Sequence, residues 1–422
     1  MKSLKILLIP NITLEYDLNQ LKGIKNALKE FNIDSHIFVS KYSEDKIIKF
    51  VEENSFNIIF AVNKGRPNGL KKEIRFISWF QDFYHDSDYL LENYEKSDIV
   101  YFYTSKESFG VSKKINCFTS TLYSAVNPSE ISLNLKNLDN DHTLVNKYQS
   151  LDFSICGYMP ANMLVPFFDF YFRNYNYKEK HFTDIHFIKW FSELTHRNEK
   201  KYEIDFYKQF IVDLQLIVES NYVPLSGDID VKLLALKLTE KIQQHFKYLN
   251  SQIFKELISF FSTDYSRFLD RIELARLLSK HSFNFALFGK EWKNYSEFDS
   301  FAGNHISKQE ELFEIYKKTK INLYNNTHGL GMHSKVFEIF ANAGFLALPK
   351  SKKNFLAAGI NEGFNENEHF VTFTSENFED LVNDWLFDTQ KRVEIGKNAR
   401  KIVINEHTWK KRTQQILEDL QR

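Results

Sequence analysis

The segment 319–349 constrains the fold more than any other part of the chain, because it predicts a complete strand, loop, helix and second strand. The apolar residues 321–324 predict a buried strand, a polar loop with two glycines spans 325–333, and residues 345–348 predict the next strand. Such a unit belongs to a parallel α/β sheet. The backbone N–H groups at the start of its helix are suited to hold an anion such as a diphosphate.

Two charged side chains on the predicted helix indicate what kind of ligand this is. Lys335 lies in the first turn, and Glu338 lies one turn later on the same face. A cation beside a diphosphate and a carboxylate that accepts hydrogen bonds from ribose hydroxyls together suit a sugar nucleotide. The alternative is an exposed ion pair on an ordinary helix, which the spacing alone predicts equally well.

The first 116 residues alternate short apolar strands with helices. This alternation favours another parallel, doubly wound sheet, whose ligands bind at the carboxyl ends of its strands. The predicted strands are 4–9, 35–39, 58–62, 75–79, 99–103 and 117–118, and the predicted helices are 18–31, 44–54, 69–73 and 105–111.

The middle of the chain predicts a linker and then a helical insert. Residues 129–147 are polar, and residues 153–157 predict the first strand of a second domain. Apolar side chains at helical spacing over 161–262 predict an inserted bundle that could form a small core of its own. Its aromatic first part, which includes Phe167 and Trp190, suits an acceptor-binding or oligomerisation surface, a membrane-surface contact or, most commonly for such side chains, a buried core.

Length, charge and cysteine usage narrow the class of protein. With 422 residues the chain is long enough for two domains, and its 55 basic and 55 acidic side chains give no basic excess for nucleic-acid binding. Cys117 and Cys156 lie far apart, as expected of structural thiols in a reducing compartment. The chain begins with a predicted strand rather than a signal peptide, and no uncharged apolar run reaches the ~18 residues of a membrane span. We therefore expect a cytoplasmic protein.

Five pieces of the C-terminal half share their order and spacing with one known family. They are FALFGKEW (285–292), KINLYNN (320–326), HSKVFEIFANAGF (333–345), FNENEHFVTF (364–373) and IGKNARKIVINEHTWKKR (395–412). Over 283–412 the chain resembles the glycosyltransferases related to the spore-coat maturation protein CgeB, which are group-1 enzymes of the two-Rossmann GT-B architecture.

The resemblance implies an α/β GT-B fold, with two Rossmann-like domains facing a cleft. Residues 1–145 are the expected acceptor-side domain, residues 150–405 the donor-binding domain with the insert at about 160–262, and residues 406–422 a helix that returns toward the first domain. The resemblance also implies a bacterial protein that moves a sugar from a nucleotide sugar to an acceptor. The acceptor is a protein, a glycan such as a cell-surface glycan, or a lipid-linked molecule.

The resemblance also implies residue roles in donor binding. Glu338 is expected to bind the donor ribose, and Lys335 the diphosphate. The full set of expected donor-binding residues is Gly289, Lys290, Asn325, Asn326, His328, Gly331, His333, Ser334, Lys335 and Glu338.

The chain departs from the family at two positions. The family usually has Arg where this chain has Lys335, which keeps the charge but not the bidentate geometry. Many retaining members carry a second Glu eight positions before the ribose-binding one, where this chain has Leu330. The stereochemical course therefore stays open, as do donor and acceptor. The alternatives are a sugar-nucleotide epimerase of the same fold and a non-catalytic binding or scaffold protein.

Two residues of the first domain are the catalytic candidates. The segment ISWFQD (77–82) resembles the strand end that faces the cleft in the family. The candidates are Asp82 at this strand end and His85 in the loop that follows. Asp82 suits the role of proton acceptor in an inverting reaction, and His85 suits the stabilisation of charge near the transferring sugar. The alternative is a surface loop with an Asx turn at Asp82.

The sequence predicts neither a metal nor a cofactor. No His, Cys or Asp spacing is typical of a zinc site, and no DxD-type motif stands where a metal-dependent transferase holds its diphosphate. The expected partners are the nucleotide sugar and the acceptor, without nucleic acid. Oligomerisation through the helical insert, or a peripheral contact of the insert with the inner membrane face, is left open.

Overall fold

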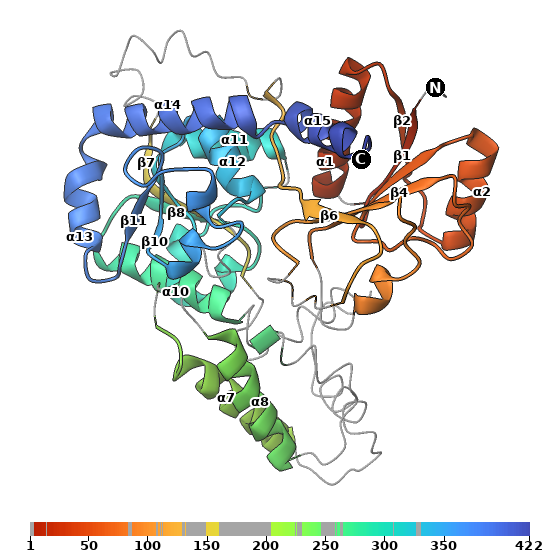
Figure 1. The fold of residues 1–422 in the computed structure, drawn as a ribbon. Coiled ribbons are helices and arrows are strands. Elements are labelled where there is room, and N and C mark those ends of the chain that lie inside the picture. Colours follow the sequence, from red (N-terminus) through yellow and green to blue (C-terminus); the bar gives the residue numbers. More distant parts are fainter. Residues whose placement is uncertain are drawn as a thin grey trace.

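The computed structural model contains two α/β units, each built on a parallel sheet (Figure 1). The expected α/β class with two such sheets is confirmed. The structure describes residues 4–13, 15–82, 87–106, 109, 111, 113–128, 131, 149–159, 204–223, 225, 230–245, 258, 260–261, 265–306, 308–325 and 331–422.

The first sheet has six strands in the order β2-β1-β3-β4-β5-β6, and all neighbouring strands are parallel. The strand order reverses at β1, so the sheet is doubly wound and offers a ligand site at the carboxyl ends of its strands. The strands are β1 (Lys5–Ile9), β2 (Asp34–Ile37), β3 (Ile58–Val62), β4 (Arg75–Phe80), β5 (Ile99–Phe102) and β6 (Phe118–Thr121).

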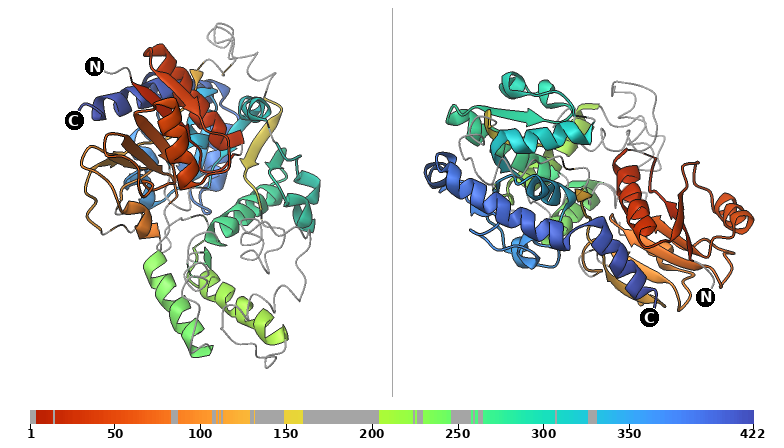
Figure 2. Two further views of the ribbon diagram at one scale, coloured as in Figure 1. Left: turned by 90° about the vertical axis from the view of Figure 1, so that its right-hand side faces the viewer. Right: turned by 90° about the horizontal axis from the view of Figure 1, so that it is seen from above.

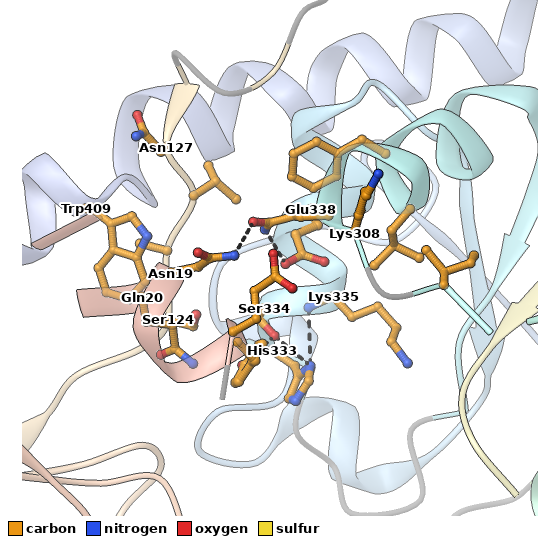
Figure 3. Close-up of a pocket in the computed structure, with 18 residues that line it drawn as sticks. Asn19, Gln20, Ser124, Asn127, Lys308, His333, Ser334, Lys335, Glu338 and Trp409 are labelled. Carbon is orange, nitrogen blue, oxygen red and sulfur yellow. Dashed lines mark hydrogen bonds between the residues drawn. The ribbon is translucent and has the colours of Figure 1, made fainter. Parts of the chain in front are cut away.

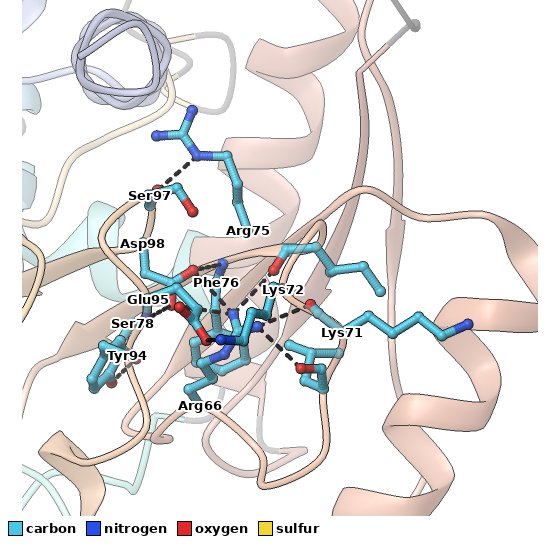
Figure 4. Close-up of polar contacts among 12 residues, drawn as sticks. Arg66, Lys71, Lys72, Arg75, Phe76, Ser78, Tyr94, Glu95, Ser97 and Asp98 are labelled. Carbon is cyan, nitrogen blue, oxygen red and sulfur yellow. Dashed lines mark hydrogen bonds and ion pairs between the residues drawn. The ribbon is translucent and has the colours of Figure 1, made fainter.

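Two expected helices of this domain are present, the helix expected at 69–73 is absent, and the segment 105–111 is only partly described. Helices α1 (Glu15–Glu30) and α2 (Glu44–Asn54) cover the sheet, whereas residues 69–73 form turns and the described part of 105–111 contains no helix. The buried Arg66 explains the absence of a helix at 69–73, because its guanidinium takes the carbonyls of Leu70, Lys71 and Ile74 at 2.9–3.2 Å (Figure 4). A tertiary contact thus satisfies groups that a helix would have paired internally.

The second sheet has five parallel strands in the order β11-β10-β9-β7-β8. Its order reverses at β7, which lies between β8 and β9, so the carboxyl ends of β7 and β9 mark the switch point where α/β sheets bind ligands. The strands are β7 (Leu151–Cys156), β8 (Phe285–Phe288), β9 (Thr319–Leu323), β10 (Leu346–Pro349) and β11 (Val371–Phe373).

The remaining helices belong to the second half of the chain. Among the described residues they are α7 (Ile204–Glu219), α8 (Val231–His245), α10 (Tyr265–Lys280), α11 (Gln309–Lys318), α12 (Ser334–Ala341), α13 (Phe378–Leu381), α14 (Thr389–Glu406) and α15 (Trp409–Asp419). Short 3-10 helices lie at Ser87–Leu91, Trp292–Asn294, Ser296–Phe301, Lys352–Phe355 and Ile360–Glu362, and a π-helical turn lies at Val382–Leu386.

The described part of the helical insert includes α7 and α8, which project away from both sheets (Figure 2). Apolar positions of these helices whose burial the structure describes, such as Leu214 and Leu238, are buried. They belong to one hydrophobic cluster with Phe153 of β7 and Leu287 of β8. The described helices therefore extend the core of the second domain instead of forming a core of their own. The aromatic segment that includes Phe167 and Trp190 lies outside the described residues.

The chain crosses between the domains at two adjacent segments. Val126 pairs with Thr408 in a parallel bridge, with Val126 N–H donating to the His407 carbonyl and Trp409 N–H to the Val126 carbonyl. Helix α15 then packs along α1 of the first domain (Figures 1 and 2). The indole of Trp409 covers Gly23, where a Cβ would lie 2.2 Å from the ring.

From these features we propose the domain boundaries expected from the sequence, with the change of domain at 145–150. Among the described residues, none of the helices has both the length and the apolar composition that crossing a membrane requires.

Candidate functional site

A cavity of about 270 Å³ lies where the two domains meet, between α1, the segment after β6, and the starts of α11 and α12 (Figure 3). It brings together four of the expected site residues, His333, Ser334, Lys335 and Glu338. The residues that line it are Glu15, Tyr16, Asn19, Gln20, Ser124, Ala125, Val126, Asn127, Ile306, Lys308, Gln309, Leu312, Phe313, His333, Ser334, Lys335, Glu338 and Trp409.

Helix α12 begins with contacts that cross the domain interface. Its N-cap is His333, whose Nδ1 accepts from the backbone N–H of Lys335 at 3.3 Å. The N–H of Ser334 donates to the hydroxyl of Tyr103 at 3.2 Å, and the Ser334 hydroxyl accepts from Tyr16 at 2.9 Å. These first N–H groups are already paired within the protein. The expectation that they are available for an anion is therefore wrong for this structure, because first-domain tyrosines and the cap occupy the helix start.

The side chain of His333 is built into this start of the helix. Its ring stacks on Tyr324 with a centroid distance of 6.1 Å. Burial, and then the nearby charge of Lys335, lower the pKa of His333 to about 3. The imidazole therefore stays neutral and keeps Nδ1 as the acceptor that the cap needs.

The carboxylate of Glu338 lines the cavity and is connected to the first domain by a chain of two amide side chains. Its Oε1 accepts from Gln309 Nε2 at 3.2 Å, and Gln309 Oε1 accepts from Asn19 Nδ2 at 3.3 Å (Figure 3). Burial raises the pKa of Glu338 to about 7, against the opposing effect of Lys335. The first domain, through Asn19 on α1, thus reaches the carboxylate by way of α11.

Lys335 connects the cavity to the carboxyl edge of the second sheet. Its Nζ donates to the carbonyl of Cys156, the last residue of β7, and lies 5.8 Å from the ring centroid of Tyr324. Burial, and next the charge of Arg271, lower the pKa of Lys335 to about 8. A buried lysine whose charge is disfavoured by neighbouring cations gains from any anion that binds beside it.

Two arginines of α10 complete a group of cations at this edge. Arg271 is buried, and its guanidinium donates to the Tyr158 carbonyl and, at 3.4 Å, to Asn325 Oδ1. Arg267 donates to the Tyr158 hydroxyl at 3.0 Å. The charges of both lower the pKa of Lys335. The expected residue Asn325 is thus present as a positioning group, which also donates to the Arg267 carbonyl at 3.2 Å.

Sequence reasoning missed the two arginines, although a signal was available. Arg267 and Arg271 lie four residues apart, on the same face of α10. Most other side chains on this face are buried and apolar. Charged residues at such a spacing on a buried face need a partner, which distinguishes them from an ordinary solvent-facing pair.

Three other expected residues lie outside the cavity. Gly289 has φ +145°, and a Cβ there would lie 2.2 Å from the Gly157 carbonyl oxygen. A Cβ at Gly331 would lie 2.3 Å from the backbone nitrogen of Ile360. Both glycines are therefore required where two backbone segments approach each other. Lys290 is exposed, on the same loop as Gly289.

Of the two catalytic candidates, the structure describes only Asp82. It lies two residues after the end of β4 and is exposed. It exchanges hydrogen bonds with Asn63, whose Nδ2 donates to Asp82 Oδ2 at 3.3 Å. Asp82 does not line the cavity, but its charge contributes to the raised pKa of Tyr16, which burial mainly causes. His85, Asn326 and His328 lie outside the described residues.

In the part of the chain that the structure describes, no three His, Cys, Asp or Glu side chains come together as a metal site would require. Both cysteines are free thiols, and burial raises the pKa of Cys156 to about 11.

The comparison with known families gives a match within the second half of the chain. Residues 266–418 match the family described as glycosyl transferase-like. This segment contains α10, the second-sheet strands from β8 onward and α12, and therefore the arginines, Lys335 and Glu338. The segment is thus similar to glycosyl transferase-like domains, which agrees with the expectation of a glycosyltransferase. No curated protein matches the chain.

Solved structures similar to this chain include one complex with UDP-glucose, one complex with UDP and DNA, and one protein named as a putative epimerase. HepE from Anabaena in complex with UDP-glucose has a TM-score of 0.48 and 9% identity over 99% of both chains. An alpha-glucosyltransferase in complex with UDP and a mismatched 13-mer DNA has a TM-score of 0.48 and 7% identity over 100% of both. A putative UDP-N-acetylglucosamine 2-epimerase from Listeria monocytogenes has a TM-score of 0.37 and 8% identity, over 99% of this chain and 95% of its own. At TM-scores below 0.5 these likenesses carry no argument about function.

Proposed function

We propose that the protein is a glycosyltransferase that takes a sugar from a nucleotide-sugar donor bound between its two domains. One observation carries the proposal: Glu338 and Lys335 stand on one helix, with the carboxylate at the cavity and the ammonium among Arg267 and Arg271 at the sheet edge. A carboxylate matches the diol of a ribose, and grouped cations match a diphosphate. The family of residues 266–418 supports the same proposal.

The donor would lie along α12, from the cavity to the switch point of the second sheet. The ribose hydroxyls would donate to Glu338, and the diphosphate would accept from Lys335, Arg271 and Arg267. Lys335 and Arg271 are fixed before the ligand arrives by the Cys156 and Tyr158 carbonyls, and Arg267 is fixed by the Tyr158 hydroxyl. Donors that are already oriented stabilise the charge that develops on a leaving nucleoside diphosphate. We propose that this chain's own cations, rather than a bound metal, offset that charge.

The acceptor would approach from the first domain. A hydroxyl oxygen of the acceptor forms a bond to the anomeric carbon of the sugar, and the bond from that carbon to the diphosphate oxygen breaks. We propose Asp82 as the base that takes the hydroxyl proton, supported by its exposed place at the carboxyl end of β4. His85 keeps its proposed role beside the transferring sugar.

The finer identity also remains a proposal. Relation to the CgeB-type enzymes, a bacterial cell-surface glycan as product, and a cytoplasmic site of action rest on the sequence resemblance. Gly289, Lys290, Asn325, Asn326, His328, Gly331, His333 and Ser334 remain proposed donor-site residues, of which Asn325 has a positioning contact with the arginines.

The test is the fate of the donor, followed by phosphorus and proton NMR. The wild-type protein is incubated with UDP-glucose, GDP-mannose and ADP-glucose, with EDTA and with added Mg²⁺. We expect release of nucleoside diphosphate from one donor, with water or an added glycan as acceptor, at the same rate in EDTA. Glu338→Ala is the matched inactive variant.

The same spectra separate the alternatives. An epimerase converts the sugar while the nucleotide stays attached, so a new sugar nucleotide appears without diphosphate release. A scaffold protein leaves every donor unchanged and binds none of them. Either pattern contradicts the glycosyltransferase proposal.

A further inference from the structure

Helix α1 of the first domain and helix α12 of the second are joined by residues that lie one turn apart on each helix. On α1 these are Tyr16 and Asn19, and on α12 they are Ser334 and Glu338. The Tyr16 hydroxyl donates to the Ser334 hydroxyl at 2.9 Å. Asn19 is connected to Glu338 through the amide of Gln309 on α11 (Figure 3). Residues three or four apart share a helix face, so both connections belong to one interface.

The hydrogen bonds of this chain run in one direction, from a cation to a carboxylate. The ammonium of Lys22 donates to Asn19 Oδ1 at 3.2 Å, and Asn19 Nδ2 donates to Gln309 Oε1 at 3.3 Å. Gln309 Nε2 in turn donates to Glu338 Oε1 at 3.2 Å. An ammonium can only donate, and an ionised carboxylate can only accept. The two charged ends therefore fix the orientation of both amides.

The hydrogen bond from Gln309 favours the ionised form of Glu338, because a charged acceptor binds a donor more strongly than a neutral one. Burial raises the pKa of Glu338 to about 7, and the charge of Lys335 and then the hydrogen bond from Gln309 oppose this increase. A carboxylate has roughly four acceptor sites, so the amide leaves others for the hydroxyls of a ribose. Glu338 thus depends on its neighbours for the charge that makes it an acceptor near neutral pH.

Other titratable groups surround Glu338 on the elements packed around it. They are Lys335 on the same helix, Tyr16 on α1, Tyr316 on α11, Cys156 of β7, and Glu15 and Lys308, which line the same cavity. Burial raises the pKa of both tyrosines, and that of Cys156 to about 11, so these three groups stay neutral near pH 7. The pKa of Lys335 is lowered to about 8, so its charge changes in the range that matters for binding.

We propose that Gln309 and Asn19 are positioning residues of the donor site, which hold the Glu338 carboxylate in place as a hydrogen-bond acceptor across the domain interface. This inference rests on the proposed function, because it assumes that Glu338 binds the ribose of the donor. The first domain then acts on the ribose site through Gln309. Separation of the domains breaks the contact between Asn19 and Gln309, so the ribose site is complete only while the domains are closed.

The first test follows the titration of Glu338 in the free protein by carbon-13 NMR of the glutamate carboxyl carbons, with Glu338→Gln to assign the signal. Gln309→Leu should raise the midpoint by about one pH unit, as expected for the loss of one hydrogen bond to a charged group. Gln414→Leu is the matched control, because Gln414 Nε2 donates to the Glu418 carboxylate at 2.8 Å and lies outside the cavity. It should leave the midpoint unchanged.

The second test changes the direction of the chain at its first-domain end. Asn19→Asp replaces the donating amide by an acceptor, which favours a turn of the Gln309 amide that takes Nε2 away from Glu338. Asn19→Ala removes the contact and leaves Gln309 free to donate to Glu338. The midpoint of Glu338 should therefore rise in Asn19→Asp, and by more than in Asn19→Ala. Equal midpoints in Asn19→Asp and the wild type would overturn the role of Asn19.

The third test measures the consequence for the ligand, by calorimetric titration of UDP, GDP and ADP at pH 6 and pH 8.5. The ratio of wild-type to variant affinity at one pH cancels the titration of the nucleotide and of Lys335. Gln309→Leu should bind its nucleotide about five- to tenfold more weakly than the wild type at pH 6 and within about twofold at pH 8.5, because a higher midpoint leaves less of Glu338 ionised. Loss of structural support alone would weaken binding equally at both pH values.

The results separate this inference from the proposed function. If Gln309→Leu leaves the midpoint of Glu338 unchanged, or weakens binding equally at both pH values, the inference is wrong although the proposed function stands. If the wild type binds none of the three nucleotides, the proposed function fails, and the inference fails with it.

Discussion

Lys335 gives the nucleotide affinity a pH dependence that its replacement by arginine should abolish. In the free protein its pKa is lowered to about 8 by burial and by Arg271. A bound diphosphate favours the charged form, so binding raises this pKa and requires the proton. The affinity contributed by Lys335 is therefore complete below pH 8 and is lost as the pH rises through 8.

The size of the effect follows from the fraction of Lys335 that is charged. With a pKa of about 8, roughly three-quarters is protonated at pH 7.5 and roughly one-tenth at pH 9. UDP should therefore bind about eightfold more weakly at pH 9, a loss of ~1.2 kcal/mol. The raised pKa of Glu338, about 7, has the opposite sign, because protonation below pH 7 removes an acceptor for the ribose. The affinity should thus be highest between pH 7 and 8.

The assay is calorimetric titration of UDP into wild type, Lys335→Arg and Lys335→Met at pH 7.5 and 9. Arginine stays charged throughout, so Lys335→Arg should keep its affinity at pH 9. Lys335→Met should bind ~30-fold or more weakly at pH 7.5, as expected for the loss of a charged hydrogen bond of ~2–3 kcal/mol. Its thermal midpoint should rise, because a disfavoured buried cation is gone. Equal pH dependence in wild type and Lys335→Arg would refute the reasoning.

Three further predictions concern the scaffold. Asp98→Ala leaves the guanidinium of Arg66, now paired with Asp98 at 3.0 Å and 2% exposed, without its carboxylate, so the free energy of unfolding in urea should fall by ~3–5 kcal/mol; a change below ~1 kcal/mol would contradict this. Gly289→Ala should lower the free energy of unfolding by ~2 kcal/mol or more, since φ +145° and the Gly157 carbonyl both exclude a Cβ. An unchanged urea midpoint would show that the loop changes its conformation to accommodate the methyl group. Tyr103→Phe leaves the first N–H of α12 unpaired and should cost ~1–3 kcal/mol, visible as faster amide exchange at that helix start; unchanged exchange there would argue against the contact.

Local sequence patterns predicted an element best where the spacing of its apolar residues agrees with the residues that begin and end it. Helix α2 (Glu44–Asn54) and strand β3 (Ile58–Val62) have the predicted bounds. In each the apolar side chains that set the period are the buried ones, such as Ile47 and Val51 of α2. Periodicity is a property of a few consecutive residues, so one sequence is enough to show it.

Predictions failed where a distant residue supplies the missing partner. The segment 69–73 has helical composition, but Arg66, held by Asp98 from 32 residues later, takes the carbonyls that a helix would use. The same holds at α12, whose first N–H group pairs with Tyr103, 231 residues earlier in the chain. No local pattern contains such contacts.

The candidate site shows the same division. The resemblance pointed to Glu338 and Lys335, and the structure places both at the domain interface. Arg267 and Arg271 join them only because α10 contacts β7, and β7 pairs with β9, the strand that precedes α12. Tyr16 and Asn19 come from the first domain and depend on how the two domains meet, which a sequence pattern does not specify.

The central claim is that a nucleotide sugar binds between the domains with its ribose on Glu338. Its most direct test is thermal unfolding of wild type and Glu338→Ala against a titration of UDP-glucose, with GDP-mannose and ADP-glucose in parallel. A ligand of the native state stabilises it by about 2.7 kcal/mol at a hundredfold excess over Kd. We predict that one donor raises the wild-type midpoint and, at the same concentration, leaves that of Glu338→Ala nearly unchanged. Equal shifts in both proteins, or none in the wild type with any donor, would contradict the claim.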